Sequence, residues 1–159
     1  MAIIKEYDPS MQQALEACYR LCLDALGWDY EPEGRHSDIL SIEDTYMRNG
    51  CFWCLYEGDL LIGMGAARCI DDANKTAELK RLYILPEHHG KGYGDMLFRN
   101  ALDYVKAQGY KAVRLDTQHD RAASLHLIKK YRFRQIESYN DNTYAALYFE
   151  LDLSRYKAG

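Results

Sequence analysis

Apolar and polar residues recur along this chain of 159 residues with two periods, which together predict a mixed fold. Runs rich in β-branched and aromatic residues predict strands. These runs cover residues 2–7, 51–57, 60–70, 76–85, 111–117, 132–138 and 144–153. Apolar residues spaced three and four positions apart predict amphipathic helices. These helices cover residues 9–26, 38–48, 94–108 and 120–131.

The turns between the strands indicate how the sheet is connected. A Gly58-Asp59 turn joins two of the strands, and the polar stretch DDANK leads into the next, so residues 51–85 predict an antiparallel meander. Gly63 and Gly65 inside the second of these strands indicate a bulge or a close approach. With no repeat or linker in the chain, we expect one α/β (mixed α+β) domain over residues 1–159. Its largely antiparallel central sheet has six to seven strands, flanked by about four helices.

Composition narrows the class of protein. Hydrophobic residues make up 48% and charged residues 28%, as in soluble domains, and the net charge of −4 argues against a nucleic-acid partner. That charge is compatible with a cationic substrate but does not establish one. No stretch reaches the roughly 20 apolar residues of a membrane span, and the N-terminus lacks a secretory apolar region, so we expect a cytoplasmic protein with no membrane partner.

The cysteines do not predict a metal site. Their odd number, five, argues against a disulfide framework. Cys51 and Cys54 form a CxxC pair, and Cys18 and Cys22 lie one helical turn apart, a set of four thiols that a zinc site could use. However, the CxxC pair lies within a predicted strand, where positions three apart point to opposite faces. We therefore expect these cysteines to be small buried apolar residues and the protein to hold no metal.

The segment LYILPEHHGKGYGDMLF, residues 82–98, carries the clearest functional signal. An apolar strand ends at a proline, Gly90, Gly92 and Gly94 follow in a turn, and a helix begins. The first amides of a helix have no partner within the helix and carry the positive end of its dipole, so this arrangement suits a phosphate or diphosphate. The spacing GxGxG matches neither the dinucleotide fingerprint nor the P-loop. The alternative is a glycine turn that only ends a loop and starts a helix.

In this context the segment ELKRLYILPEHHGKGYG resembles motif A of the GNAT superfamily of N-acetyltransferases, Arg/Gln-x-x-Gly-x-Gly/Ala after a strand. Gly92 and Gly94 match its glycines, while His89 stands where Arg or Gln is usual. The segment RLDTQHDRAASLHLIKKYRFRQIESY resembles, more weakly, the next strand and the motif B helix. The resemblance covers nearly the whole chain and implies a GNAT-like fold with acetyl-CoA as cosubstrate.

The resemblance also implies where the cofactor lies. Main-chain groups of Leu82, Tyr83 and Ile84 would pair with the pantetheine arm, and an N–H near Ile84 would polarise the thioester carbonyl. Amides of the loop would hold the pyrophosphate, namely those of His89, Gly90, Lys91, Gly92, Tyr93 and Gly94. Arg121 and Ser124 stand at the Asn and Ala positions of motif B and are expected to contact the cofactor as well.

The sequence offers fewer candidate catalytic residues than cofactor-binding ones. Glu78 lies on the strand leading to the loop, where some members of the family have a general base; the alternative is a solvated carboxylate paired with Lys80 or Arg81. Ile128 occupies the position of the usual tyrosine acid and cannot donate a proton. Tyr131 lies on the same predicted helix but is displaced by most of a turn.

Three functions remain open from the sequence. The first is an N-acetyltransferase acting on a primary amine of a small molecule or peptide, and the second a domain that binds acyl-CoA without turnover, suggested by Ile128. The third is an interaction domain with a merely structural glycine turn.

Two more features of the sequence bear on the ligands and partners. Lys129, Lys130, Arg132 and Arg134 form either a solvated helix end or a 3′-phosphate contact. The segment 27–50 could supply an aromatic, acidic acceptor wall from Trp28, Tyr30, Glu31 and Glu33, and the final strand could pair across a homodimer.

Overall fold

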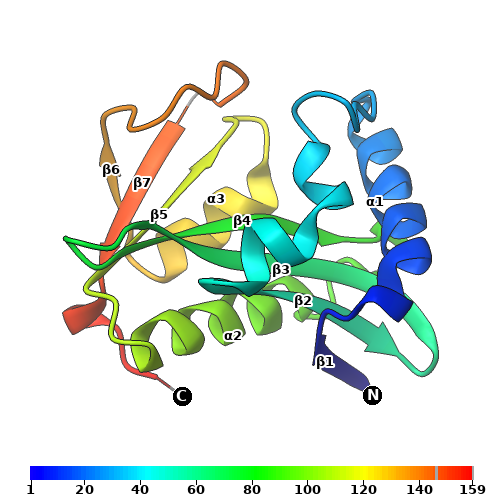
Figure 1. Ribbon diagram of the computed structural model, residues 1–159, viewed down its shortest axis with the longest axis horizontal. Coiled ribbons are helices and arrows are strands. Elements are labelled where there is room, and N and C mark those ends of the chain that lie inside the picture. Colours follow the sequence, from blue (N-terminus) through cyan, green and yellow to red (C-terminus); the bar gives the residue numbers. More distant parts are fainter. Residues whose placement is uncertain (146, 159) are drawn as a thin grey trace.

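The sheet has seven strands in the order β1-β2-β3-β4-β5-β7-β6. A computed structural model describes residues 1–145 and 147–158 (Figure 1). The strands are β1 (Ala2–Glu6), β2 (Gly50–Glu57), β3 (Leu60–Asp71), β4 (Thr76–Ile84), β5 (Ala112–Thr117), β6 (Arg134–Ile136) and β7 (Leu147–Asp152). The predicted mixed fold class is thus confirmed. The strand predicted at 144–153 includes residue 146, which lies outside the described residues.

Strands β2 to β4 form the predicted antiparallel meander, and β1 pairs with β2 in the antiparallel direction. The next strand, β5, joins β4 in parallel, because the helix α2 (Tyr93–Ala107) carries the chain back across the sheet between them. This parallel ladder is short and pairs only residues 76–78 with residues 112–114. Beyond it the two strands have no ladder, and the site described below lies there.

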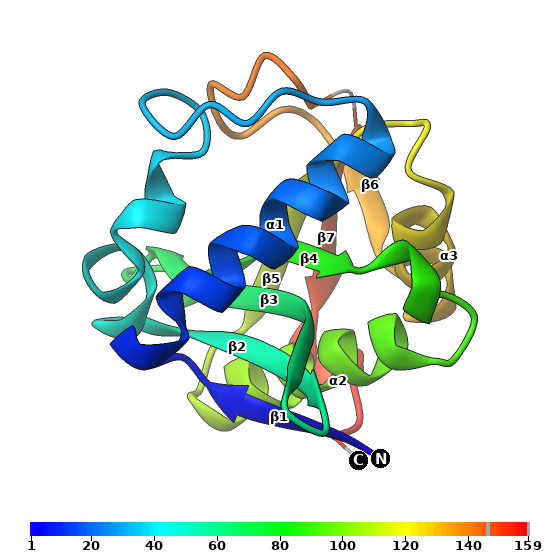
Figure 2. The ribbon, with the colours of Figure 1, turned by 90° about the vertical axis from the view of Figure 1, so that its right-hand side faces the viewer.

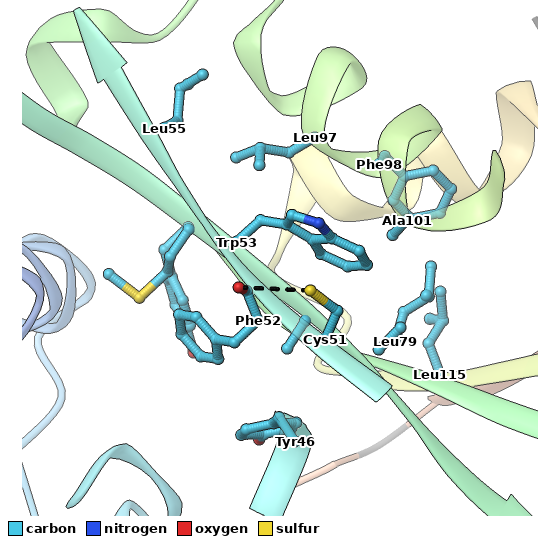
Figure 3. Packing of buried hydrophobic residues seen from close by; sticks show 14 of the residues in the cluster. Tyr46, Cys51, Phe52, Trp53, Leu55, Leu79, Leu97, Phe98, Ala101 and Leu115 are labelled. Carbon is cyan, nitrogen blue, oxygen red and sulfur yellow. Dashed lines mark hydrogen bonds between the residues drawn. The ribbon is translucent and has the colours of Figure 1, made fainter. Parts of the chain in front are cut away.

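Helices cover both faces of the sheet. On β2, Phe52 packs against Tyr46 with ring centroids 5.4 Å apart, whereas the next residue, Trp53, packs against Tyr104 of α2 at 5.1 Å (Figure 3). Neighbouring strand residues point to opposite faces, so α2 and the segment around Tyr46 lie on opposite sides. The helix α1 (Gln12–Leu26) shares the Tyr46 side, since its Tyr19 contacts Tyr83 of β4 at 5.2 Å (Figure 2).

Most helix predictions hold, but one helix differs. Residues 38–48 form a 3-10 turn (Ser37–Leu40) and a short π-helical turn (Glu43–Met47) instead of one α-helix. The break is at Ser41, whose φ of −138° is extended and whose hydroxyl bonds both the carbonyl of Ser37 and the hydroxyl of Thr45. Local side-chain bonds of this kind compete with the helix. The apolar pattern survives, with Ile39, Ile42 and Tyr46 all buried.

The ends of other elements also differ from the predicted ones. The helix predicted at 9–26 opens with a 3-10 turn (Pro9–Met11) before α1, and the helix predicted at 120–131 is α3 (Ala122–Lys130). The strand predicted at 132–138 shortens to Arg134–Ile136, because Arg132 has a φ of +63° and makes a turn. Gly27 ends α1 with a φ of +74°, as the sequence predicted.

The route suggested for a homodimer is wrong. The final strand β7 lies between β5 and β6 and pairs with both, so it offers no free edge to another copy. The exposed edges of the sheet belong to β1 and β6. Within the described residues, no helix has the length and apolar character that a bilayer crossing requires.

Candidate active site

A cavity of about 330 Å³ lies where β4 and β5 separate. The ladder between these strands ends at the pair Glu78–Arg114. Beyond this pair, residues of both strands line the space between them. Both strands line the cavity, as do one face of α2, the start of α3, and two loops around Trp28 and Asn142. A cleft between parallel strands next to the start of a helix is a common place for a ligand in α/β proteins.

A bulge in β4 shapes one wall of this cavity. Between Met64 and Ala66 the strand β3 advances two residues, while β4 advances three, from Tyr83 to Lys80. Arg81 takes up the extra residue with a φ of +59°, a conformation that costs a non-glycine side chain energy. Close packing next to the bulge explains Gly63, because a Cβ there would lie 2.9 Å from the carbonyl oxygen of Tyr83.

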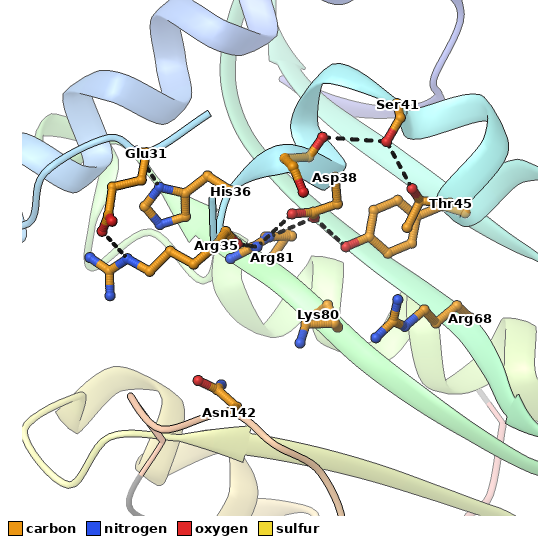
Figure 4. Close-up of polar contacts among 12 residues, drawn as sticks. Glu31, Arg35, His36, Asp38, Ser41, Thr45, Arg68, Lys80, Arg81 and Asn142 are labelled. Atoms are coloured by element: carbon orange, nitrogen blue, oxygen red, sulfur yellow. Dashed lines mark hydrogen bonds and ion pairs between the residues drawn. The ribbon is translucent and has the colours of Figure 1, made fainter. Parts of the chain in front are cut away.

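An ion pair between Arg81 and Asp38 holds the bulge. The Arg81 guanidinium donates to both carboxylate oxygens of Asp38, at 2.9 and 2.7 Å, and to the carbonyl of Arg35 at 2.9 Å (Figure 4). Although burial opposes ionisation, these bonds lower the pKa of Asp38, which therefore stays charged. Sequence reasoning missed this pair, since an arginine in a left-handed conformation has no sequence signature and its partner lies 43 residues away.

Unpaired amides lie at the start of α2. The strand β4 ends, a 3-10 turn (Pro86–His88) follows, and Gly90 and Gly92 adopt φ values of +78° and +81°. Gly92 is the N-cap of α2, and no side chain caps the helix. Among the described residues nothing accepts a hydrogen bond from the amides of residues 90–95, and the first helical bond runs from Met96 to Gly92. Six successive donors are therefore free for an anion.

His89 departs from the prediction. Its amide already donates to the carbonyl of Pro86 at 3.1 Å, so the row of free donors starts at Gly90 rather than at His89. The imidazole Nε2 lies 2.8 Å from the carbonyl oxygen of Ile84, one of the groups expected to face the pantetheine arm. His89 therefore ties the loop to the end of β4.

Side chains brace the loop from the β2–β3 hairpin. The Tyr93 hydroxyl donates to Glu57, and this bond lowers the pKa of that carboxyl. The Lys91 ammonium lies 4.0 Å and the His88 Nδ1 3.6 Å from the same carboxylate. Lys91 itself is about half exposed and adds positive charge beside the free amides.

The start of α3 closes the cavity. Arg121 donates to the carbonyl of Leu82 at 3.2 Å, and its guanidinium lies 4.9 Å from the ring centre of Tyr83. Ser124 and Ile128 line the same cavity, so the residue at the usual tyrosine position does face the site but is apolar. Leu82 and Tyr83 also line it, whereas Ile84 lies at its margin, outside the lining.

Tyr131 lies elsewhere. Its ring stacks on Phe98 at 5.3 Å, and its hydroxyl bonds Asp95. The basic cluster predicted near this helix end is divided, because Lys130 also pairs with Asp95, at 2.5 Å, whereas Arg134 pairs with Glu150, at 2.6 Å. Two of its four charges thus have partners within the chain.

Glu78 is buried, with 2% of its surface exposed, so the solvated alternative is wrong. One carboxylate oxygen accepts from Arg68 at 3.1 and 3.0 Å, and the other accepts from the Tyr139 hydroxyl at 2.6 Å. Burial and the Glu78 charge raise the pKa of Tyr139, which stays protonated as a donor. Of the two partners proposed for the solvated alternative, Lys80 lies 3.9 Å away and Arg81 binds Asp38. Glu78 sits at the base of the cleft but does not line the cavity, and its role as a base stays a prediction.

The part of residues 27–50 that lines the cavity is aromatic but not acidic. Trp28 lines the cavity as expected, yet Glu31 and Glu33 are exposed, and Glu31 pairs with Arg35 at 2.8 Å. The ionisable residues that this segment does contribute to the cavity are Arg35 and His36. The amide of Glu31 donates to Nδ1 of His36, and burial with Arg81 and Arg35 nearby lowers the pKa of His36 to about 4. His36 is therefore neutral near pH 7.

The cysteines are all free, and four of the five are buried. Within residues 1–145 and 147–158, no three His, Cys, Asp or Glu side chains are grouped in a way that could hold a metal ion.

Comparison with known proteins gives one family and many similar folds. The model of the acetyltransferase (GNAT) family matches residues 10–133. The N-acetylaspartate synthetase of Danio rerio is 29% identical over 132 residues, covering 77% of this chain and 46% of that protein. The rat N-acetylaspartate synthetase is 32% identical over 103 residues, covering 64% and 34%. The chain thus spans less than half the length of these curated relatives.

Solved structures agree on the fold. A GNAT-family acetyltransferase from Staphylococcus aureus superposes with a TM-score of 0.84 at 17% identity, covering 96% of this chain and 99% of that one. An N-acetyltransferase from Thermoplasma acidophilum, solved in complex with coenzyme A, gives a TM-score of 0.71 at 18% identity, with 96% and 99% covered. At these identities the likeness shows a shared fold.

Proposed function

The chain belongs to the GNAT family of acetyltransferases, and from that premise we propose that it transfers an acetyl group from acetyl-CoA to a primary amine. The observation that carries the proposal is the row of free amides over residues 90–95, next to a cavity between two separating strands. The amides suit the diphosphate of coenzyme A, and the cavity suits its pantetheine arm and the thioester. The names of the relatives, which include an N-acetyltransferase 8, support nitrogen as the acceptor atom.

The proposed reaction is a direct transfer. The amine nitrogen attacks the thioester carbonyl carbon, the carbon–sulfur bond breaks, and the sulfur leaves as the thiolate of coenzyme A while the nitrogen gives up a proton. Amines with a pKa of about 10 are mostly protonated near pH 7, so a base helps. We propose Glu78 for this role, acting through water because it lies at the base of the cleft.

The leaving thiolate would need no protein acid. Ile128 cannot donate a proton, but a thiol with an ordinary pKa of about 8.5 is a tolerable leaving group as the thiolate. Arg121, at the mouth of the cavity, would add positive charge near the developing anion. Arg121 would have to release the carbonyl of Leu82 for that carbonyl to pair with the pantetheine arm.

A second function is favoured by one observation. Because Ile128 lines the cavity at the tyrosine position, the domain could hold acyl-CoA without turnover. Release of free thiol from acetyl-CoA, measured across a panel of small amines and short peptides, separates the two functions. Thiol release with an N-acetylated product supports the enzyme; binding of acetyl-CoA in calorimetry without any thiol release supports the binding domain. Absence of binding at high micromolar acetyl-CoA defeats both.

The role of Glu78 has its own test. The Glu78→Gln variant should lower kcat by about 100-fold or more, with little change in the Kd for acetyl-CoA, because general base catalysis contributes factors of that size. The Glu137→Gln variant, at an exposed carboxylate, is the control and should behave as the parent. Undiminished turnover in Glu78→Gln would remove Glu78 from the mechanism.

A further inference from the structure

Positive charge gathers on the acceptor side of the cavity, although the whole chain carries a net charge of −4. Four basic side chains capable of permanent charge line the cavity: Arg35, Lys80, Arg81 and Arg121. Asp116 is the single carboxylate among the described lining residues. It accepts hydrogen bonds from the side-chain amides of Asn140 and Asn142, at 2.6 and 3.3 Å.

The arginines of this group already have acceptors. Arg81 is held by both oxygens of Asp38, and Arg35 pairs with Glu31 at 2.8 Å. Arg121 donates to the carbonyl of Leu82. Their positions are fixed by the protein itself, so a ligand is not needed to explain them.

Lys80 differs from these arginines. Its nearest carboxylate oxygen is Oε1 of Glu78, at 3.9 Å, which is too far for a hydrogen bond. That oxygen already accepts two bonds from Arg68. The described residues provide no hydrogen-bond acceptor to the Lys80 ammonium, although only 19% of its side chain is exposed. The ammonium has three donors, and because Lys80 lines the cavity, a ligand there can accept from them.

The surroundings of Lys80 direct it toward a ligand. Figure 4 shows it beside the Asp38–Arg81 pair on one side and Arg68 on the other, with Asn142 on the facing loop. Both Lys80 and Asn142 line the cavity, which also has to admit the thioester. The space of about 330 Å³ is enough for a small acceptor beside the thioester.

We propose that the acetyl acceptor is a small amino acid, whose carboxylate is bound by the ammonium of Lys80. This inference rests on the proposed function and names its substrate class. A carboxylate supplies the missing acceptor in a charge-assisted hydrogen bond. A polyamine is disfavoured, because it would place further positive charge beside Lys80 and the arginines.

The same charges help the chemistry. Positive groups around a bound amine disfavour its protonated form and so lower its pKa toward neutrality. The carboxylate of the acceptor offsets that repulsion at the binding step, while the amine nitrogen remains the group that must lose its proton. Lys80 therefore acts as a specificity residue that contacts the substrate.

Kinetics with matched acceptors test the proposal. Each of several α-amino acids is compared with the corresponding amino-acid amide, which keeps the size and loses the carboxylate. We expect kcat/KM for the acid to exceed that for the amide by about 30-fold, the size of a charge-assisted hydrogen bond. In Lys80→Gln the preference should vanish, mainly through a higher KM for the acid. Lys80→Arg should retain most of it, and Lys5→Gln, at an exposed lysine, should change nothing.

Two results would overturn the inference. One is a parent protein that acetylates the amides or a polyamine as well as it acetylates the acids. The other is a Lys80→Gln variant that loses acid and amide activity equally while keeping its affinity for acetyl-CoA. Both leave acetyl transfer itself intact, whereas absence of thiol release with every amine tested would defeat the proposed function instead.

Discussion

The two ends of the proposed site are built in opposite ways. The proposed phosphate end, next to the cavity, consists of main-chain amides from one continuous stretch, residues 90–95. The acceptor end consists of side chains from segments far apart in the sequence, among them Arg35, Lys80 and Asn142. The first depends on backbone conformation and the second on long-range ion pairs. Substitutions should therefore affect the two ends independently.

The difference also shows how charge is arranged. Amide donors do not titrate and carry only partial charges, so the proposed phosphate end would not depend on a cluster of basic side chains. The acceptor end uses full charges, two of which are neutralised in the pairs Arg81–Asp38 and Arg35–Glu31. The net charge of the chain predicts neither end, and its negative sign is opposite to the charge of the acceptor side.

The largest effect is expected at the Arg81–Asp38 pair. Asp38→Ala would leave Arg81 mostly buried, in a left-handed conformation, without its carboxylate. Loss of one partner of a buried pair costs about 3 kcal/mol of unfolding free energy. Urea denaturation measures this cost. The matched control is Asp44→Ala, which breaks the exposed pair with Arg48 and should cost about 0.5 kcal/mol or less. Equal losses in the two variants would show that the pair does not support the bulge.

The next effect concerns the phosphate end. Gly92→Val places a β-branched residue at a φ of +81°, which distorts the loop and misdirects its amides. We expect the affinity for coenzyme A to fall by about 30-fold, or about 2 kcal/mol. Gly109→Val is the control, since Gly109 has a φ of +87° at the other end of α2 and equally open space. Both substitutions should strain the backbone to a similar extent. Titration calorimetry should nevertheless find weaker binding of coenzyme A only in Gly92→Val, and weaker binding in both variants would contradict the account.

Lowering the pH should reduce the free energy of unfolding through His36, which lies at the acceptor end. The pKa of His36 is lowered to about 4 from an ordinary value of 6.5, so the unfolded chain takes up this proton first. The stability contributed by neutral His36 is complete above pH 6.5 and is lost as the pH falls toward 4. Across this range the loss is at most about 1.4 kcal/mol for each pH unit. Urea denaturation across this range should give a shallower pH dependence in His36→Asn than in the parent. The exposed His126→Asn should keep the parent slope, and equal slopes in all three proteins would refute this role.

The smallest effect is expected from Tyr93, whose side chain supports the loop of residues 90–95 through its hydrogen bond to Glu57. Tyr93→Phe removes the hydroxyl that bonds Glu57 but leaves every amide in place. The affinity for coenzyme A should therefore fall by only about threefold, as expected for one partly buried hydrogen bond. Titration calorimetry measures the affinity for coenzyme A of this variant and of Gly92→Val under the same conditions, so that the two losses can be compared. A loss as large as that of Gly92→Val would mean that side chains, rather than amides, carry the binding.

The sequence predicted the local conformation of residues 82–98 well, because the information for it is local. A strand, a proline, three glycines and a helix lie within residues 82–98, and both Gly90 and Gly92 adopt the positive φ that their residue type permits. Only the extent of the free amides differed, since the bond from His89 to Pro86 depends on the local fold of the turn.

The acceptor end could not be predicted in the same way. Glu31 and Glu33 suggested an acidic wall, but burial decides which side chains face the cavity, and Arg35 faces it instead. Arg81 at the bulge and its partner Asp38 become adjacent only when the sheet has formed. Likewise, the break at Ser41 arises from side-chain bonds that a helical pattern does not reveal.

The central claim is that the free amides of residues 90–95 bind the diphosphate of coenzyme A. Amide NMR spectra recorded during a titration with coenzyme A test it most directly. The amide signals of residues 90–95 should shift strongly, and their exchange with water should slow, while the amide of His89, already bonded to Pro86, should change less. Saturable binding of coenzyme A that leaves the signals of residues 90–95 unmoved would contradict the account.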